Sequence, residues 1–87
     1  MDSASGDDRL TMPWSRVVGA KQTLKRLKAG QVTAVYVARD AETAVVGEVV
    51  KTAEALHVPI HYVADMAELG RACGIHVGAA CAGRLQG

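Results

Sequence analysis

The run Val32–Ala38 constrains the fold of this chain more than any other segment. Its residues are mostly apolar and β-branched, with Thr33 as the one clearly polar position. A short run of this kind is typical of a strand that is covered on both faces, because a half-exposed strand alternates polar and apolar residues. It is also far shorter than the roughly 20 apolar residues that cross a bilayer, which excludes a membrane-spanning helix. The sequence therefore predicts a sheet between helices.

The remaining segments supply those helices and further strands. We predict helices at residues 20–29, 40–56 and 65–73, and strands at residues 17–18, 32–38, 60–63 and 77–82. The order is strand, helix, strand, helix, strand, helix, strand, which favours an α/β fold with a mixed, mostly parallel sheet of four strands. A chain of 87 residues has room for one domain. We expect residues 1–8 to form a disordered tail, residues 9–15 a short helix or turn, and residues 9–87 the domain.

Helix boundaries and buried faces follow from capping residues and periodicity. In the first helix, Ala20, Thr23, Leu24 and Leu27 share the buried face and Gly30 ends the helix. Asp40 is expected to cap the second helix, and Asp65 with Glu68 resembles a capping box for the third. The predicted apolar stripe of the second helix consists of Val45, Val46, Val49, Val50, Ala53 and Leu56, and that of the third consists of Met66, Leu69 and Cys73.

Charge is distributed unevenly although the net charge is only +1. Residues 16–39 contain six cations and no acid, whereas residues 40–70 contain six acids and one lysine. Within the basic segment, Lys21, Lys25 and Lys28 fall on one ridge of the first helix, away from its apolar face. The pattern suits a surface that binds a polyanion, and it equally suits a solvated helix face. Aromatic residues make up only 3% of the chain, which disfavours an aromatic sheet that stacks RNA bases.

No catalytic or metal-binding constellation stands out. Cys73 and Cys81 are too far apart for the paired spacing of structural zinc sites, and with two cysteines a reducing cytoplasm is the expected compartment. We interpret both cysteines and the three histidines as structural residues, and we expect no metal or other cofactor. Gly70, Gly74 and Gly78 are interpreted as helix packing, cap and turn. Gly19 stands between a strand and a helix that begins with Lys21, where backbone N–H groups and a cation suit a phosphate, although a plain turn has the same sequence.

Four motifs in order resemble a known family. They are Val-Val-Gly-Ala-Lys-Gln-Thr-Leu-Lys at 17–25, Val-Ala-Arg-Asp-Ala-Glu at 37–42, Val-Pro-Ile at 58–60, and Leu-Gly-Arg-Ala-Cys-Gly-Ile-His-Val-Gly-Ala-Ala at 69–80. Together they resemble the kink-turn-binding ribosomal proteins, the family of archaeal large-subunit proteins seven-Ae and thirty-e, and the chain looks like its short, stand-alone bacterial branch. The resemblance implies a three-layer α-β-α sandwich with a four-stranded mixed sheet. It also implies binding of kink-turn RNA, a sharply bent element with tandem sheared G·A pairs.

The resemblance implies which residues contact the RNA. Gly19, Lys21, Gln22 and Lys25 fall on the signature at the first helix start, Glu42 falls where the family places an acid near a flipped-out nucleotide, and Ile75, His76, Val77 and Gly78 fall on the loop that packs against it. Lys28 and Arg39 complete the expected basic surface. Archaeal members usually carry Asn and Glu where this chain has Lys21 and Gln22, which exchanges amide and carboxylate readout of guanine edges for a point charge and an amide.

The expected function is therefore non-enzymatic recognition of structured RNA, such as ribosomal RNA, by a monomeric cytoplasmic protein. The alternative from another class is a protein-interaction module, because the same fold serves protein partners elsewhere in the superfamily. The lysine ridge and the corner at residues 19–22 favour RNA over that alternative. A small enzyme finds no supporting constellation in the sequence.

Overall fold

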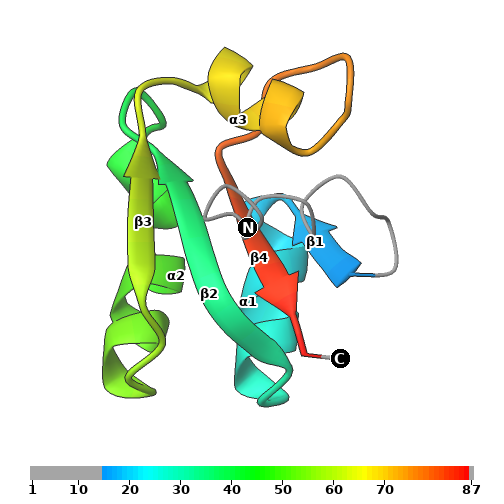
Figure 1. Ribbon diagram of the computed structural model, residues 1–87. Coiled ribbons are helices and arrows are strands. Elements are labelled where there is room, and N and C mark those ends of the chain that lie inside the picture. Colours follow the sequence, from blue (N-terminus) through cyan, green and yellow to red (C-terminus); the bar gives the residue numbers. More distant parts are fainter. Residues whose placement is uncertain (1–14, 87) are drawn as a thin grey trace.

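The computed structural model describes residues 15–86 (Figure 1). The elements are β1 (Arg16–Val18), α1 (Ala20–Lys28), β2 (Val32–Ala38), α2 (Thr43–Ala55), β3 (Ile60–Val63), α3 (Met66–Ala72) and β4 (Cys81–Leu85). Their order is the one that the sequence predicts. The expected tail at residues 1–8, and the helix or turn expected at 9–15 apart from Ser15, lie outside the described residues. Within residues 15–86, no helix has the length and apolar character that a membrane span requires.

The four strands form one mixed sheet in the order β1-β4-β2-β3. β2 and β3 pair in parallel, whereas β4 lies between β1 and β2 and is antiparallel to both. A mixed, mostly parallel sheet was expected, and β1, β2 and β3 do run in the same direction. Among the hydrogen-bonded pairs of the described strands, however, only β2–β3 is parallel, so the expectation is wrong for the pairing. The reason is the short α3, whose seven residues advance about 10 Å. The chain therefore enters the sheet again at the end where β3 stops, and β4 runs in the direction opposite to β3.

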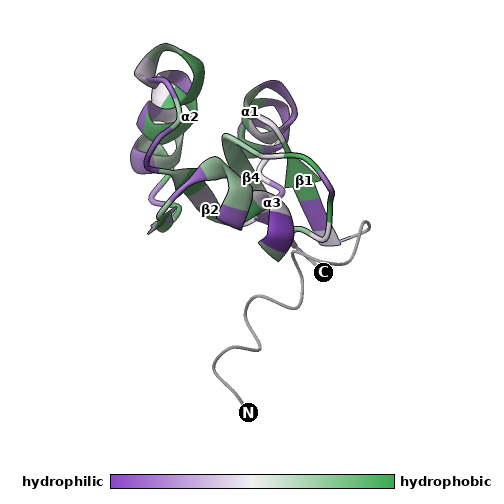
Figure 2. Ribbon diagram, turned by 90° about the horizontal axis from the view of Figure 1, so that it is seen from above, coloured by the Kyte–Doolittle hydropathy of each residue, from purple (hydrophilic) through white to green (hydrophobic). Residues whose placement is uncertain are grey.

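The helices cover the sheet on both faces, as the run in β2 requires. Val35 and Val37 pack against α1 and α2, whereas Ala34, Tyr36 and Ala38 pack against α3. Figure 2 shows α1 and α2 together on one face and α3 on the other, so the fold is a three-layer α-β-α sandwich. Thr33 is the extra residue of an irregularity in the β2–β4 register, which turns Val32 toward the α1 and α2 side.

α1 and its buried face agree with the sequence prediction. Thr23 and Leu27 are buried and the helix ends at Lys28, one residue before the expected end. Gly30 follows with a φ of 74°, in the left-handed region where glycine is favoured. The helix therefore lies on the sheet through Thr23 and Leu27 and leaves its lysines in solvent.

α2 differs from its prediction at both ends. Its N-cap is Glu42 and not Asp40, because residues 39–42 are needed to turn the chain from β2 onto the helix. The Asp40 carboxylate instead accepts a hydrogen bond of 2.8 Å from the backbone N–H of Met66, at the start of α3. Val46, Val49 and Ala53 are buried as expected, but Val45 is 45% exposed at the edge of the apolar stripe. The helix ends at Ala55, and Leu56, its C-cap residue, is 49% exposed.

The region of α3 and β4 contains small residues whose predicted secondary structure is wrong. Asp65 caps α3 as expected, by accepting a hydrogen bond of 2.7 Å from the backbone N–H of Glu68. β4, however, begins at Cys81 and not at Val77. The preceding residues 77–79 pack against α3, whereas Ala80 packs on the α1 and α2 side, and a Cβ atom at Gly70 would lie 2.1 Å from the carbonyl oxygen of Val77. The apolar, small residues that suggested a strand therefore form a loop pressed onto a helix.

Candidate nucleic-acid interface

The residues expected to contact RNA come mostly from three segments at one end of the sheet. β1, β2 and β3 end there and β4 begins there, because the first three strands oppose the fourth. The backbone N–H of Gly19 donates to the carbonyl of Cys81 at 2.9 Å, and that of Ala38 donates to the carbonyl of Ala80 at 2.9 Å. We call this region, residues 19–22, 39–42 and 74–80, the loop end (Figure 1). The topology thus brings together segments that are up to about 60 residues apart in the sequence.

The start of α1 is open at the loop end. Gly19 adopts a φ of 95° and a ψ of 151°, a conformation that side chains rarely allow, and it leaves the helix without a side-chain cap among the described residues. The first turn contains no acid, and Lys21 and Gln22 are exposed. Uncapped N–H groups, the positive end of the helix dipole and a lysine side by side favour an anion such as phosphate.

The loop at residues 74–80 is held firmly against α3. The N–H of Ile75 donates to the carbonyl of Gly70 at 3.0 Å, and the N–H of Ala79 donates to the carbonyl of Met66 at 3.0 Å. Ile75 packs on the α3 side of the core, whereas His76 and Gly78 are exposed and Val77 is 70% exposed. The loop is therefore tied to α3 by backbone hydrogen bonds and presents a partly apolar surface to solvent.

The interpretation of the glycines in this region is confirmed at Gly70 and Gly74 and differs at Gly78. Gly70 packs closely against the loop, and Gly74 follows the C-cap of α3 with a φ of 74°. Gly78 was expected in a turn, but its backbone forms neither a turn nor a bend, and a Cβ atom there would lie 3.2 Å from the Cβ of Met66. Close packing at Gly70 and Gly78 and the cap at Gly74 together set the position of the residues that precede β4.

Arg39 and Glu42 belong to the same end, on the turn between β2 and α2. The backbone N–H of Arg39 donates to the carbonyl of Val63 at 2.9 Å, which ties the turn to the end of β3. The Arg39 guanidinium lies 5.3 Å from the centre of the Tyr62 ring, within the range of a cation–π contact. Glu42 is the exposed N-cap residue of α2, and its side chain makes no capping hydrogen bond.

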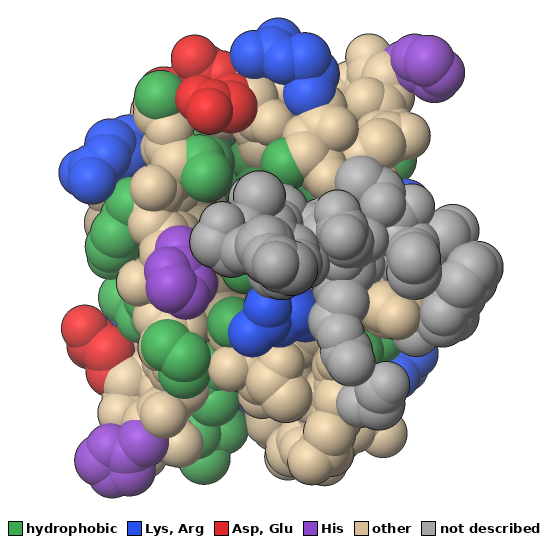
Figure 3. Space-filling model, viewed as in Figure 1, with side chains coloured by type: hydrophobic (Ala, Val, Ile, Leu, Met, Phe, Trp, Pro, Cys, Tyr) green, Lys and Arg blue, Asp and Glu red, His purple; other side chains and the backbone are tan. Residues whose placement is uncertain are grey.

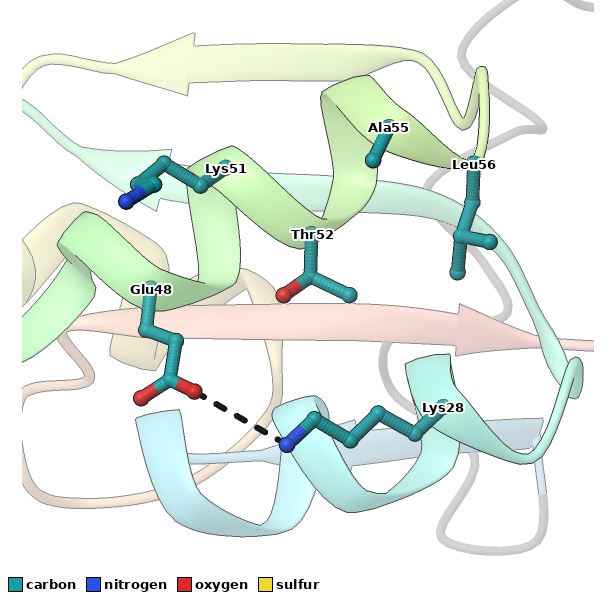
Figure 4. A pocket seen from close by; sticks show the side chains of 6 residues that line it. All are labelled: Lys28, Glu48, Lys51, Thr52, Ala55 and Leu56. Carbon is teal, nitrogen blue, oxygen red and sulfur yellow. Dashed lines mark ion pairs between the residues drawn. The ribbon is translucent and has the colours of Figure 1, made fainter.

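The lysine ridge of α1 does not stay at the loop end. Lys25 and Lys28 lie in the last turn of the helix. The ammonium of Lys28 is 3.7 Å from the carboxylate of Glu48 on α2, with 61% and 68% of the two side chains exposed (Figure 4). Of the ridge, Lys21 lies at the loop end, Lys25 farther along the helix, and Lys28 at the opposite end of the molecule.

Sequence reasoning missed two features of this region. Val45, interpreted as a core residue, instead lines a cavity of about 270 Å³ between α1 and α2, together with Lys21 and Glu48. Val45 is next to other apolar residues in the sequence, so the sequence did not indicate that its side chain is exposed. Only its position on the helical wheel could have indicated that it lies at the edge of the apolar stripe of α2. Asp40 accepts a hydrogen bond from the backbone N–H of Met66, which is 26 residues away, a contact without a local signal.

The charge of the loop end is mixed. Figure 3 shows acidic, basic and histidine side chains along the end of the molecule that α3 and the following loop form. Among residues 15–86, no group of three or more His, Cys, Asp and Glu residues could hold a metal ion. Both cysteine thiols are free and buried, and burial raises the pKa of Cys81 to about 11 and also raises the pKa of Cys73. Protonated, buried thiols are poor nucleophiles and poor metal ligands.

Known proteins resemble this chain in sequence and in fold. A protein of Caldanaerobacter subterraneus subsp. tengcongensis named as an RNA-binding protein is 49% identical over 75 residues, which span 86% of this chain and 92% of the relative. The RNA-binding protein YbxF of Geobacillus stearothermophilus is 43% identical over 70 residues, or 80% of this chain and 85% of the relative.

A solved structure and a family profile agree with these relatives. The 15.5kD RNA binding protein of Giardia lamblia has a TM-score of 0.83 at 22% identity, over 100% of this chain and 78% of that protein, and it shows a shared fold. The profile of the ribosomal protein L7Ae/L30e/S12e/Gadd45 family matches residues 12–87. The match covers most of the chain, and the chain belongs to the ribosomal protein L7Ae/L30e/S12e/Gadd45 family.

Proposed function

We propose that this protein binds structured RNA without catalysing a reaction, and that it recognises the kink-turn with its tandem sheared G·A pairs. One observation carries the proposal. The first helix start, the turn after β2 and the loop before β4 lie together at one end of the sheet. A bent RNA offers two backbone strands and an unstacked base at close range, and a site assembled from three segments can contact all of them.

Each segment supplies a different kind of contact in this proposal. The open start of α1 and Lys21 receive phosphate, and the exposed amide of Gln22 at the same start hydrogen-bonds to base edges. The exposed Val77, on a loop that is hydrogen-bonded to α3, packs against an unstacked base. Arg39 and Lys25 neutralise the backbone, and Glu42 accepts hydrogen bonds near the flipped nucleotide.

The relatives named as RNA-binding proteins support RNA as the partner, because they match most of this chain. The proposal further takes the protein to act as a monomer in the cytoplasm, on ribosomal RNA or another folded transcript. The mixed charge of the loop end fits shape-specific recognition better than general attraction to nucleic acid, since a general binder gains affinity mostly from net positive charge.

The first prediction tests this function with two RNAs of equal length. The purified protein should bind a kink-turn with tandem G·A pairs at least roughly tenfold more tightly than a straight duplex, measured by gel shift or calorimetry at several salt concentrations. The preference should persist as salt rises, because base contacts and packing are less screened than phosphate contacts. Equal affinities would refute specific recognition, and no binding to either RNA would leave the protein-interaction alternative.

A further inference from the structure

A second cavity lies beside the loop end, between α2 and the edge strand β3. Its volume is about 420 Å³, and its floor is formed by Val37, Val46 and Val50. This volume falls within the roughly 300 to 1,000 Å³ of small-ligand sites, which are usually apolar with a few polar groups. None of the residues expected to contact RNA from the sequence lines it, except Arg39.

Gly47 keeps this cavity open. It lies in the middle of α2 and lines the cavity, and a Cβ atom built on it would find only the Thr43 Cγ2 atom, at 4.0 Å. Glycine inside a helix costs roughly 0.5 to 1 kcal/mol relative to alanine. No close packing among the described residues requires it here, in contrast to Gly70. Packing of the described residues therefore does not explain why a glycine occupies position 47.

An aromatic ring and a guanidinium form one wall of the cavity. Tyr62 lies on β3, at the edge of the sheet, and is 49% exposed. The Arg39 guanidinium, 5.3 Å from the ring centre, lies over the Tyr62 ring. An exposed tyrosine beside an arginine offers two flat surfaces on which a nucleobase can stack.

The charges around the cavity favour an anion. Arg39 and Lys51 line it, and no acidic side chain of the described region does so. Lys51 also lines a neighbouring pocket, which Figure 4 shows, and its side chain there points away from the Lys28–Glu48 ion pair. A flat apolar floor, a ring for stacking and two cations together match a base with its phosphate.

We propose that this cavity binds one unpaired nucleotide of the RNA, next to the structured element at the loop end. The cavity is continuous with the loop end, because Arg39 and Ala41, which line it, belong to the turn between β2 and α2. The proposal rests on the proposed function and extends it by one single-stranded subsite. It adds Tyr62, Lys51 and Gly47 to the residues that contact RNA.

The test compares a kink-turn RNA with and without a single-stranded extension of about five nucleotides, placed at either end of the RNA. For the wild-type protein, the better-placed extension should raise affinity roughly tenfold. Gly47→Leu fills the cavity with a good helix former and should abolish this increase without changing the affinity for the RNA that lacks an extension. Ala55→Leu is the matched control, on the exposed part of the same helix outside the cavity, and should keep the increase.

Two further variants identify the contacts. Tyr62→Leu should lose most of the increase through lost stacking, and Lys51→Ala should lose part of it and lower the salt dependence of the extended RNA only. In parallel, adenosine monophosphate is titrated alone while the amide signals of Gly47 and Tyr62 are followed by NMR.

Every outcome separates the subsite from the proposed function. If the wild-type protein binds both RNAs equally, or if Gly47→Leu keeps the increase, the subsite is wrong while kink-turn binding stands. If the wild-type protein binds neither RNA, the proposed function fails and the subsite fails with it. Tight binding of free adenosine monophosphate without an effect of the extension would assign the cavity to a free nucleotide and overturn the proposal.

Discussion

The two ends of the α1 and α2 layer differ in how the helices begin and end. Both helices start at the loop end, where neither has a side-chain cap among the described residues. Both end at the opposite side, which we call the turn end, where Gly30 and His57 adopt positive φ values of 74° and 60°. At the turn end the helix carbonyls favour cations, and Lys28 is paired with Glu48.

This difference places the lysines of one helix in different electrostatic surroundings. Lys25, Arg26 and Lys28 stand in the last turn of α1, where they complement the negative end of the helix dipole. Lys21 stands at the positive end, where a second positive charge is useful only if an anion binds. The same ridge thus stabilises the helix at one end and is available to a ligand at the other.

The largest expected effect breaks the loop end itself. Gly70→Ala should lower the free energy of unfolding by about 3 kcal/mol or more, because the new Cβ would lie 2.1 Å from the Val77 carbonyl oxygen, a backbone atom that cannot move without the loop. Gly30→Ala at the turn end meets no atom within 4 Å and should cost only about 1 kcal/mol through its positive φ. Urea unfolding of both variants measures the difference, and similar costs would show that the loop is not held as described.

Two variants with an intermediate expected effect should distinguish specific recognition of the kink-turn from general electrostatic attraction to RNA. Gln22→Ala and Val77→Asp should each lower affinity for the kink-turn on the order of 1 to 3 kcal/mol and leave affinity for a straight duplex almost unchanged. Both side chains are exposed, so the melting temperature should not fall. Titrations of the two RNAs at matched salt provide the measurement. A parallel loss for both RNAs would mean that these residues do not carry specificity.

The smallest effect sharpens the comparison along one helix. Lys25→Ala should weaken binding of the kink-turn and the duplex alike and reduce the salt dependence by about one counterion. Lys28→Ala should change neither affinity, because Lys28 lies at the turn end and its charge is offset by Glu48, and its exposed ion pair should contribute less than about 0.5 kcal/mol to stability. If Lys28→Ala weakens RNA binding as much as Lys25→Ala, the RNA extends along the whole of α1.

The sequence predicted those parts of the fold that depend on local patterns. The boundaries of β2 and β3 are correct and the end of α1 is off by one residue, because Gly30 and the buried run of β2 are strong local signals. The start of β4 was predicted too early, because residues 77–80 are as small and apolar as a strand, whereas residues 77–79 pack against α3. That packing is a tertiary contact, and the periodicity of the sequence does not predict it.

In the candidate site, too, the features with a local sequence signal could be predicted and those that depend on tertiary structure could not. Gly19 could be recognised as a special position, because a glycine between a strand and a lysine-bearing helix start marks a sharp corner of the backbone. The separation of Lys28 from the loop end could not be recognised, since the ion pair depends on how α1 and α2 lie together. The cavity beside Tyr62 requires the order of the strands, which places β3 at the edge, and that order came only with the structure.

The central place of β4 has a consequence for how the protein reaches its native state. β4 is the last strand in the sequence, yet in the described sheet it is the strand that joins β1 to β2. Contacts between residues far apart in the chain form slowly, because a long loop must close before they gain any energy. During synthesis, β1 and the corner at Gly19 therefore remain without their partner until residues 81–85 have been made. The protein should become competent to bind RNA only after residues 81–85 have been made and have paired with β1 and β2.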